Sequence, residues 1–203
     1  MSPRVPAPLH RGRLRLGAHM SIAGGLHRAL QRGFDAGCDV IQIFVRSNQQ
    51  WATAPLDPEQ VDLWHDARRR KGVHAAMVHG SYLINLSAQR HQLRERSYRT
   101  LALEYARAAL LGIPYYVIHP GAHVGQGEAA AIRHIAHAID QLFDAQPANP
   151  TMLLLENTAG QGTCIGNRFE HLRDIFALVR APERLGICID TCHLLAAGYD
   201  LRS

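Results

Sequence analysis

Apolar residues occur along this chain in short, nearly continuous runs that are separated by longer segments of mixed polarity. The runs lack a regular alternation with polar residues, which is typical of parallel strands buried on both faces. Glycine and proline residues separate them from the longer segments, which we interpret as helices. The predicted strands cover residues 14–22, 40–45, 73–78, 115–118, 152–156 and 185–190, and the predicted helices cover residues 26–36, 59–71, 89–111, 128–144 and 168–179.

Strand–helix units that repeat with short connections predict a right-handed parallel α/β architecture. Both the α/β barrel and the doubly wound sheet belong to this class. No Gly-x-Gly-x-x-Gly motif follows the first strand and no phosphate-binding lysine loop is present, so we expect no nucleotide cofactor and favour a TIM-type (β/α) barrel. The sequence shows about six of the eight βα units of such a barrel. We therefore expect the chain to be incomplete at its C-terminal end.

The composition fits one folded domain without a membrane segment. The chain has 203 residues, 47% of them hydrophobic, which is enough for a buried core. Residues 1–13 contain three prolines and no apolar run, so we expect a disordered leader there and one domain over residues 14–203. No run reaches the roughly 18 apolar residues of a membrane span. A cytoplasmic location is expected.

The net charge and the cysteine content exclude few classes of function. The net charge is +5, but Arg4, Arg11, Arg13 and Arg15 near the N-terminus supply four positive charges. A nucleic-acid surface would therefore need local clustering of charge. Four cysteines in a chain of this length do not indicate a disulfide framework. The two that flank Asp190 are expected to be buried free thiols rather than metal ligands; they are Cys188 and Cys192.

Metal-binding side chains stand at the carboxyl ends of four predicted strands: His79, His119, Glu156 and Asp190. Because side chains alternate along a strand, we expect these four to face the lumen of the barrel and their apolar neighbours to face the helices. These neighbours are Ile118, Leu155 and Ile189. Two imidazoles with carboxylates form a donor set that zinc accepts, and a carboxylate can bridge two metal ions. The pattern predicts a metal site.

Further candidates lie on loops at the same end of the barrel. His193 follows Asp190 by three residues. We expect His19 and His123 to contact the metal ligands and orient them without binding the metal themselves. Gln49 and Tyr82 are candidates for contact with a bound molecule, although an aromatic residue in a loop also commonly caps a hydrophobic core.

Four segments, in one order along the chain, carry a resemblance to a known family. They are Gly17–Gly25, His119–His123, Glu156–Gly162 and Cys188–His193. They resemble the signature segments of endonuclease IV, the zinc-dependent apurinic/apyrimidinic endonuclease family of DNA base-excision repair, and the resemblance runs from about Leu16 to Arg202. It implies a xylose-isomerase-like barrel with three zinc ions at its C-terminal mouth.

The resemblance also assigns ligands. His79, His119 and Glu156 match ligands of the first zinc, Glu156 also bridges to the second, Asp190 helps to bind the second, and His193 matches a ligand of the third. The family's other ligands have no match in this sequence. We therefore expect fewer than three zinc ions in this chain.

The activity implied by the resemblance is hydrolysis of the phosphodiester 5′ to an abasic site in double-stranded DNA, leaving a 3′-hydroxyl and a 5′-deoxyribose phosphate. Hydroxide supplied by zinc-activated water would attack, with Glu156 as the catalytic metal bridge. Tyr82 matches a residue near bound DNA. Gln49 stands where relatives carry an arginine that inserts into the base stack, so we expect weaker insertion unless Arg46 substitutes.

Two other functions remain open at this point. The chain is also consistent with a non-catalytic remnant that binds zinc and damaged DNA, and less well with a sugar isomerase or epimerase on the same barrel. An open barrel of six strands exposes strand edges, so we also expect self-association through these edges.

Overall fold

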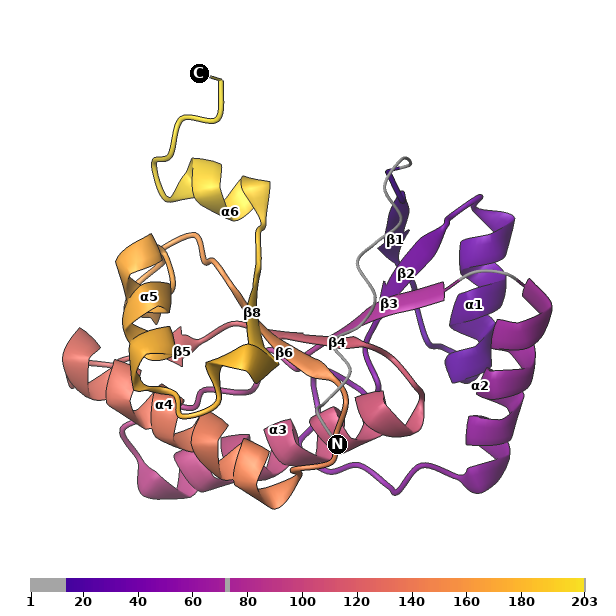
Figure 1. Cartoon of the computed structure of the whole chain (residues 1–203), viewed down its shortest axis with the longest axis horizontal. Helices are drawn as coiled ribbons and strands as arrows, with labels where there is room; N and C mark the ends of the chain where they lie inside the picture. Colours follow the sequence, from indigo (N-terminus) through magenta and orange to yellow (C-terminus); the bar gives the residue numbers. More distant parts are fainter. Residues whose placement is uncertain (1–13, 72–73, 203) are drawn as a thin grey trace.

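Six parallel strands form one curved sheet in the order β1-β2-β3-β4-β6-β8, as the computed structural model shows for residues 14–71 and 74–202 (Figure 1). The strands are β1 Gly17–His19, β2 Val40–Ile43, β3 His74–His79, β4 Tyr115–Ile118, β6 Met152–Glu156 and β8 Leu185–Cys188. Neighbours in this sheet pair in parallel. The predicted parallel α/β architecture is therefore confirmed, while the expected leader over residues 1–13 lies outside the described residues.

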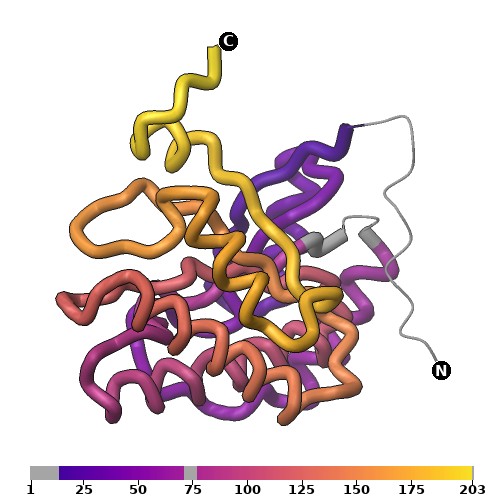
Figure 2. The backbone as a smooth tube through the Cα atoms, turned by 60° about the vertical axis from the view of Figure 1, so that its left-hand side comes forward, coloured from indigo at the N-terminus to yellow at the C-terminus, as the bar shows by residue number. Residues whose placement is uncertain are grey.

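The helices between the strands connect them and cover the outer face of the curved sheet, whereas the last helix follows β8 and stands at the top of Figure 1 (Figures 1 and 2). The helical elements are α1 Leu26–Asp35, α2 Pro58–Lys71, α3 His91–Leu110, α4 Glu128–Ala145, α5 Phe169–Leu178, the 3-10 turn η1 Pro182–Arg184 and α6 Thr191–Ala196. The core lies between helices and sheet, where apolar side chains of the central strands, such as Tyr116, Leu153 and Leu155, are fully buried. No helix of the described residues is both long and apolar enough to cross a membrane.

β1 and β8 stand at the two ends of the strand order and flank the opening of the curved sheet at the top of Figure 1. Ile118 and Leu155 are buried on the helix side, as predicted. The prediction for Ile189 is wrong, because its side chain is 52% exposed. Strand β8 ends at Cys188 and has a paired strand on one side only, so Ile189 gains no cover from a further unit.

Four short elements have no counterpart among the predicted ones: the strands β5 and β7, the turn η1 and the helix α6. Residues Gly121–Ala122 (β5) pair in antiparallel fashion with Cys164–Ile165 (β7), which joins the loops after β4 and β6. This ribbon depends on a long-range contact between two-residue segments, so no local sequence pattern predicts it. Helix α6 is six residues long, too short to show a helical repeat, and begins where the Asp190 side chain accepts a hydrogen bond from the His193 backbone N–H.

Candidate metal centre

Neighbouring strands bring the predicted metal-binding side chains together. His79 is the last residue of β3, His119 follows β4, Glu156 is the last residue of β6, and Asp190 follows β8 as the N-cap of α6. Because β3, β4, β6 and β8 are adjacent and parallel, their carboxyl ends meet at one edge of the sheet. His193 reaches the same edge from the first turn of α6.

Glu156 lies at the centre of this group, and its two oxygens face different partners. Oε2 is 2.8 Å from Nε2 of His79 and 3.3 Å from Nε2 of His119. Oε1 is 3.4 Å from Nδ1 of His193, whose Nδ1 is also 3.7 Å from Oδ2 of Asp190. Two donor sets therefore share one carboxylate: His79, His119 and Glu156 form the first, and Glu156, Asp190 and His193 form the second.

The donor geometry fits a zinc-sized ion. Ligand atoms about 2.0–2.1 Å from one zinc ion lie at most roughly 4 Å apart. The two separations within the first set, 2.8 and 3.3 Å, satisfy this limit, whereas the atoms of the second set lie within 4.8 Å of one another. The Nδ1 atom of His79 is 2.8 Å from the Gly80 carbonyl oxygen, which leaves Nε2 to face the centre.

The charges of the centre also suit a cation. Burial alone would raise the pKa of Glu156, but hydrogen bonds from His119 and His79 lower it to about 2. Burial lowers the pKa of His79, yet hydrogen bonds to Glu156 and Gly80 outweigh burial and raise it overall. Glu156 is thus ionised across the physiological range. Burial, Glu156 and Asp190 raise the pKa of Cys188 to about 11, so it stays a neutral thiol.

The prediction that Cys188 and Cys192 are buried is not met, because Cys188 is half-buried and Cys192 is exposed. All four cysteines are free, and neither Cys188 nor Cys192 belongs to a donor set among the described residues. Cys192 is exposed rather than buried, because it lies in the short helix α6 at the opening of the sheet.

Asn157 fixes the position of Asp190, a role that the sequence alone did not reveal. Its side-chain Oδ1 accepts a hydrogen bond from the Asp190 backbone N–H at 2.7 Å, and its Nδ2 donates to the Asp190 carbonyl oxygen at 2.9 Å. The Asn157 carbonyl oxygen lies 2.9 Å from Nδ1 of His193. Because Asn157 is 1% exposed, these contacts hold the end of β8 against β6.

Tyr82 covers the first donor set from the solvent side. It is 63% exposed, and its ring centroid lies 5.4 Å from that of His79 and 5.9 Å from that of His119. A cavity of about 240 Å³ opens beside it and is also lined by His119 and His193. An exposed aromatic face next to a cavity at the centre suits contact with a bound molecule.

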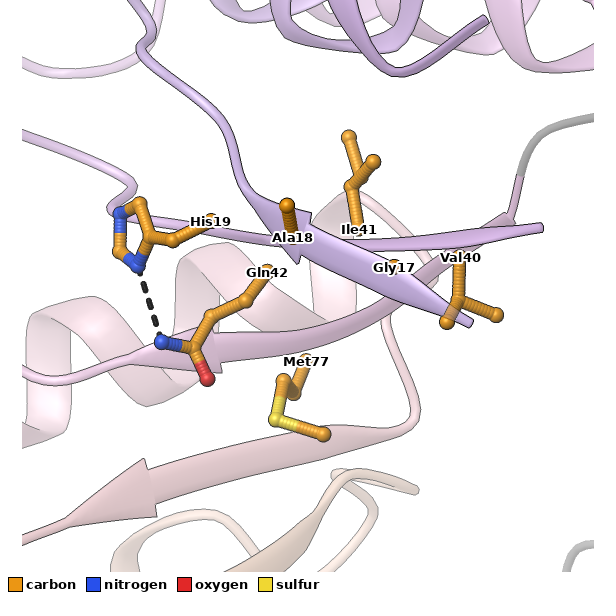
Figure 3. A pocket seen from close by; sticks show the side chains of 7 residues that line it. All are labelled: Gly17, Ala18, His19, Val40, Ile41, Gln42 and Met77. Atoms are coloured by element: carbon orange, nitrogen blue, oxygen red, sulfur yellow. Dashed lines mark hydrogen bonds between the residues drawn. The ribbon is translucent and has the colours of Figure 1, made fainter. Parts of the chain in front are cut away.

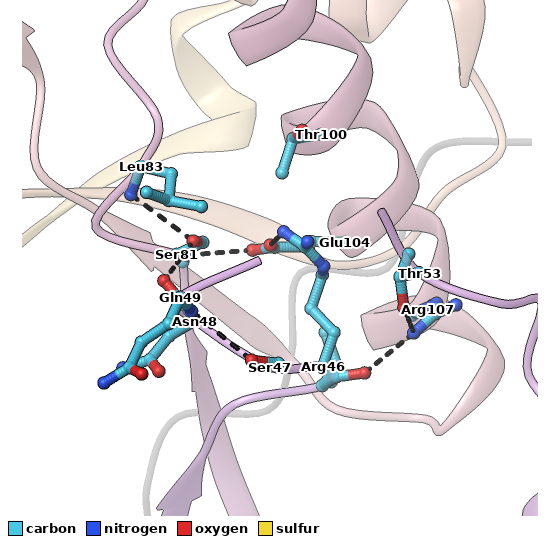
Figure 4. A network of polar contacts seen from close by, with 12 residues as sticks. Arg46, Ser47, Asn48, Gln49, Thr53, Ser81, Leu83, Thr100, Glu104 and Arg107 are labelled. Atoms are coloured by element: carbon cyan, nitrogen blue, oxygen red, sulfur yellow. Dashed lines mark hydrogen bonds and ion pairs between the residues drawn. The ribbon is translucent and has the colours of Figure 1, made fainter. Parts of the chain in front are cut away.

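Gln49 lies exposed on the loop between β2 and α2, where only a weak backbone contact to Ser47 holds it, 3.4 Å from N to Oγ (Figure 4). Arg46 does not take over the expected inserting role. Its side chain is 1% exposed and its Nη1 lies 3.1 Å from Oε1 of Glu104 on α3. The alternative that Arg46 substitutes for the inserting arginine therefore fails, because the buried ion pair holds Arg46 in the interior.

His19 and His123 lie apart from both donor sets. His19 is 2.9 Å from the Gln42 amide nitrogen and helps to line a cavity of about 290 Å³ at the β1 end of the sheet (Figure 3). Its ring stacks 4.5 Å from Phe44, which in turn lies 5.9 Å from His79. Nδ1 of His123 accepts a hydrogen bond from the Gly125 N–H. The orienting role of both histidines stays a prediction.

The fold is that of a TIM-type barrel with two candidate metal-donor sets, and comparison with known proteins agrees on the fold. Residues 30–202 match the family model described as a xylose isomerase-like TIM barrel. A probable endonuclease 4 of Chloroflexus aurantiacus is 50% identical over 188 residues, which cover 93% of this chain and 66% of that protein. The crystal structure of endonuclease IV from Thermus thermophilus superposes with a TM-score of 0.78 at 35% identity, covering 92% of this chain and 66% of that one. The chain belongs to the endonuclease IV family.

Sugar epimerases share the fold at lower similarity. A D-tagatose 3-epimerase-like protein superposes with a TM-score of 0.70 at 16% identity, covering 88% of this chain and 66% of that one, which shows the fold alone. The chain spans about two thirds of the length of the curated relatives that it matches, 66% for the one from Chloroflexus aurantiacus.

Proposed function

We propose that this protein is a zinc-dependent endonuclease that hydrolyses the phosphodiester 5′ to an abasic site in double-stranded DNA. The products would be a 3′-hydroxyl and a 5′-deoxyribose phosphate. The observation that carries the proposal is the shared position of Glu156 between two donor sets. A carboxylate held between two metal positions is the arrangement that phosphodiester hydrolysis by clustered metals requires.

We assign the first zinc position to His79, His119 and Glu156, and a second position to Glu156 and Asp190, with His193 as a ligand to a further ion. When bound, zinc would supply a water of lowered pKa and stabilise charge on the attacking and leaving oxygens. Glu156 would hold the ions close together, because its oxygens face the two sets separately. Asn157 would keep Asp190 in reach.

The surroundings of the centre suit a nucleotide that has lost its base. A missing base removes stacking and pairing, so turning that nucleotide out of the duplex costs least at the lesion. The cavity beside Tyr82 offers space for the exposed sugar, and the Tyr82 ring offers an apolar face. We therefore assign Tyr82 to contact with DNA. Gln49 projects from a neighbouring loop and would lie near the duplex.

A second candidate is a protein that binds one zinc ion and damaged DNA without cutting it. Glu156 is common to both donor sets, and of the remaining ligands only His79 is buried: its side chain is 8% exposed, against 36% for His119, 34% for Asp190 and 28% for His193. This difference would favour retention of one ion. A sugar epimerase has no comparable support, since that likeness extends only to the fold.

Metal content and cleavage, measured on the same preparation, separate the candidates. The chain would be loaded with zinc, freed of excess metal, analysed by mass spectrometry and then incubated with a duplex that carries one abasic site. More than one zinc per chain together with chelator-sensitive cutting 5′ to the site supports the endonuclease. One zinc with binding and no cutting supports the second candidate, and turnover of a ketose without cutting contradicts both.

A further inference from the structure

A groove with three arginines lies outside the metal centre, between the loop after β2 and helix α3. Its volume is about 360 Å³. The lining residues are Arg46, Trp51, Ala52, Thr53, Arg96, Arg99, Thr100 and Leu103. Arg46 forms the buried base, while Arg96 and Arg99 stand exposed on α3.

The guanidinium of Arg46 has donors that the protein does not satisfy. Its Nη1 donates to Glu104 Oε1 at 3.1 Å, but Nε and Nη2 are buried without a hydrogen-bond partner among the described residues. A buried donor without a partner is costly, and an ion or water that the groove holds commonly accounts for one. Since Arg46 lines the groove, an acceptor bound there would satisfy these donors.

The buried charges beside the groove do not balance. Arg46 and Arg107 are both buried and lie close to a single carboxylate, that of Glu104 (Figure 4). Among the described residues, Arg107 donates to neutral acceptors: the carbonyl oxygens of Val45 and Ala54 and the Thr53 hydroxyl. One buried positive charge therefore lacks a counter-charge within this network, and an anion in the groove would provide it.

The rim adds further positive charge. Arg96 and Arg99 form no ion pair within the described part of the chain. The guanidinium of Arg96 is held over the ring of Trp51, 4.7 Å from its centroid, which places a cation at the mouth of the groove. Three guanidinium groups line one groove, and this group suits a phosphate, because the planar fork of arginine can donate two hydrogen bonds to one anion.

We propose that this groove binds a phosphate group, offered either by a nucleic-acid backbone or as free phosphate. The nucleic-acid source rests on the proposed function, whereas phosphate binding itself does not. The groove and the metal centre lie at the same end of the sheet, since Glu104 also accepts a hydrogen bond from the Ser81 backbone N–H, two residues after His79. A DNA strand bound at the candidate metal centre would thus extend towards the groove, which would offer a second contact to its backbone.

Tryptophan fluorescence provides a direct test. Trp51 lines the groove, while the second tryptophan, Trp64, is fully buried in the core. The full chain, in EDTA so that the metal centre does not contribute, would be titrated with inorganic phosphate and, separately, with a single-stranded oligonucleotide, against chloride at equal ionic strength. The variants are Arg96→Ala and Arg99→Ala, with Arg133→Ala on the exposed face of α4 as the matched control.

We expect saturable binding that is about tenfold weaker in each rim variant, the loss typical of one charge-assisted contact, and unchanged in Arg133→Ala. The signal should disappear in Trp51→Phe. Saturation with phosphate identifies the free ion as a ligand, and saturation with the oligonucleotide alone identifies the backbone as the source. The proposal is overturned if phosphate and the oligonucleotide change the fluorescence no more than chloride does. It is also overturned if the rim variants and Arg133→Ala bind equally well. Water would then be the partner of Arg46.

Discussion

Nε2 of His79 lies 2.8 Å from Oε2 of Glu156, although 77 residues separate the two along the chain. Their contact follows from the sheet. β3 and β6 both pair with β4, so each of the two residues ends a strand next to the same neighbour. His79 is opposite Val117, and Glu156 pairs with Cys188 on its other side. Strand order and register thus build the metal centre, and the helices that connect the strands make this order possible.

The first prediction concerns the pH dependence of zinc binding. Hydrogen bonding to Glu156 and Gly80, which outweighs burial, raises the pKa of His79 above its ordinary value of 6.5, so its ring carries a proton in mildly acidic solution. Zinc must displace this proton, whereas Glu156, with a pKa of about 2, offers none to displace. Zinc affinity should therefore fall as the pH is lowered, by roughly tenfold for each pH unit below the pKa of His79.

Competition with a chromophoric chelator between about pH 8 and pH 6, corrected for the protonation of the chelator, would measure this effect. The variant His79→Asn should bind less zinc and show a shallower dependence. An affinity that does not change over this range would mean that His79 is not a ligand.

The second prediction concerns Asn157, whose side chain makes two hydrogen bonds to the backbone of Asp190. Asn157→Ala leaves these buried groups without partners, so the free energy of unfolding should fall by about 1–3 kcal/mol. Zinc content should fall at the second donor set, because Asp190 loses its support, and persist at His79, His119 and Glu156.

Asn149→Ala provides the matched control for this change. Asn149 lies in the turn before β6, where its side chain donates to the Tyr105 carbonyl oxygen and to Gln146. Loss of the Asn149 side chain should lower the melting temperature without lowering the zinc content. If both variants keep the same zinc content, Asn157 supports only the fold.

The third prediction tests the loop after β2. Gln49 is exposed and uncharged, so Gln49→Arg adds a longer, charged side chain at the position where we expect relatives to carry an inserting arginine. Affinity for a duplex with one abasic site should rise several-fold, roughly 1 kcal/mol, relative to an intact duplex. Fluorescence anisotropy at fixed salt would measure both affinities. Gln50→Arg adds the same charge one residue later, and an equal gain there would indicate general attraction to DNA instead of insertion.

The fourth prediction follows from the two ends of the sheet. Leu16 before β1 is 65% exposed, and Ile187 in β8 is 46% exposed, so each end of the described sheet presents apolar surface beside an edge strand. Such edges pair readily with other chains. The 203-residue chain should form dimers or larger species at tens of micromolar in size-exclusion chromatography with light scattering, and Ile187→Lys should reduce them. A monomer at every concentration that melts cooperatively would contradict this expectation.

The sequence was informative where apolar runs are continuous and end in polar residues. β4 and β6 have the predicted bounds, and the side chains at their ends, His119 and Glu156, meet as expected. Features that depend on distant pairing were not predictable. The ribbon of β5 and β7 joins two loops, and Asn157 acquires its role from hydrogen bonds to a residue 33 positions away. The burial of Arg46 was not predictable either, because its partner, Glu104, lies 58 residues later on α3.

The most direct measurement of the central claim is cleavage of a duplex with one abasic site, in excess zinc, by the wild-type chain and by Glu156→Gln side by side. Glu156 is the one carboxylate that both donor sets share within the described residues. Loss of its charge should lower the cleavage rate by at least about 100-fold, more than the loss expected for a residue that only supports a ligand. Zinc-dependent cutting 5′ to the site that disappears in Glu156→Gln is the predicted result. Absence of cutting by the wild-type chain, or equal cutting by the two proteins, would contradict it.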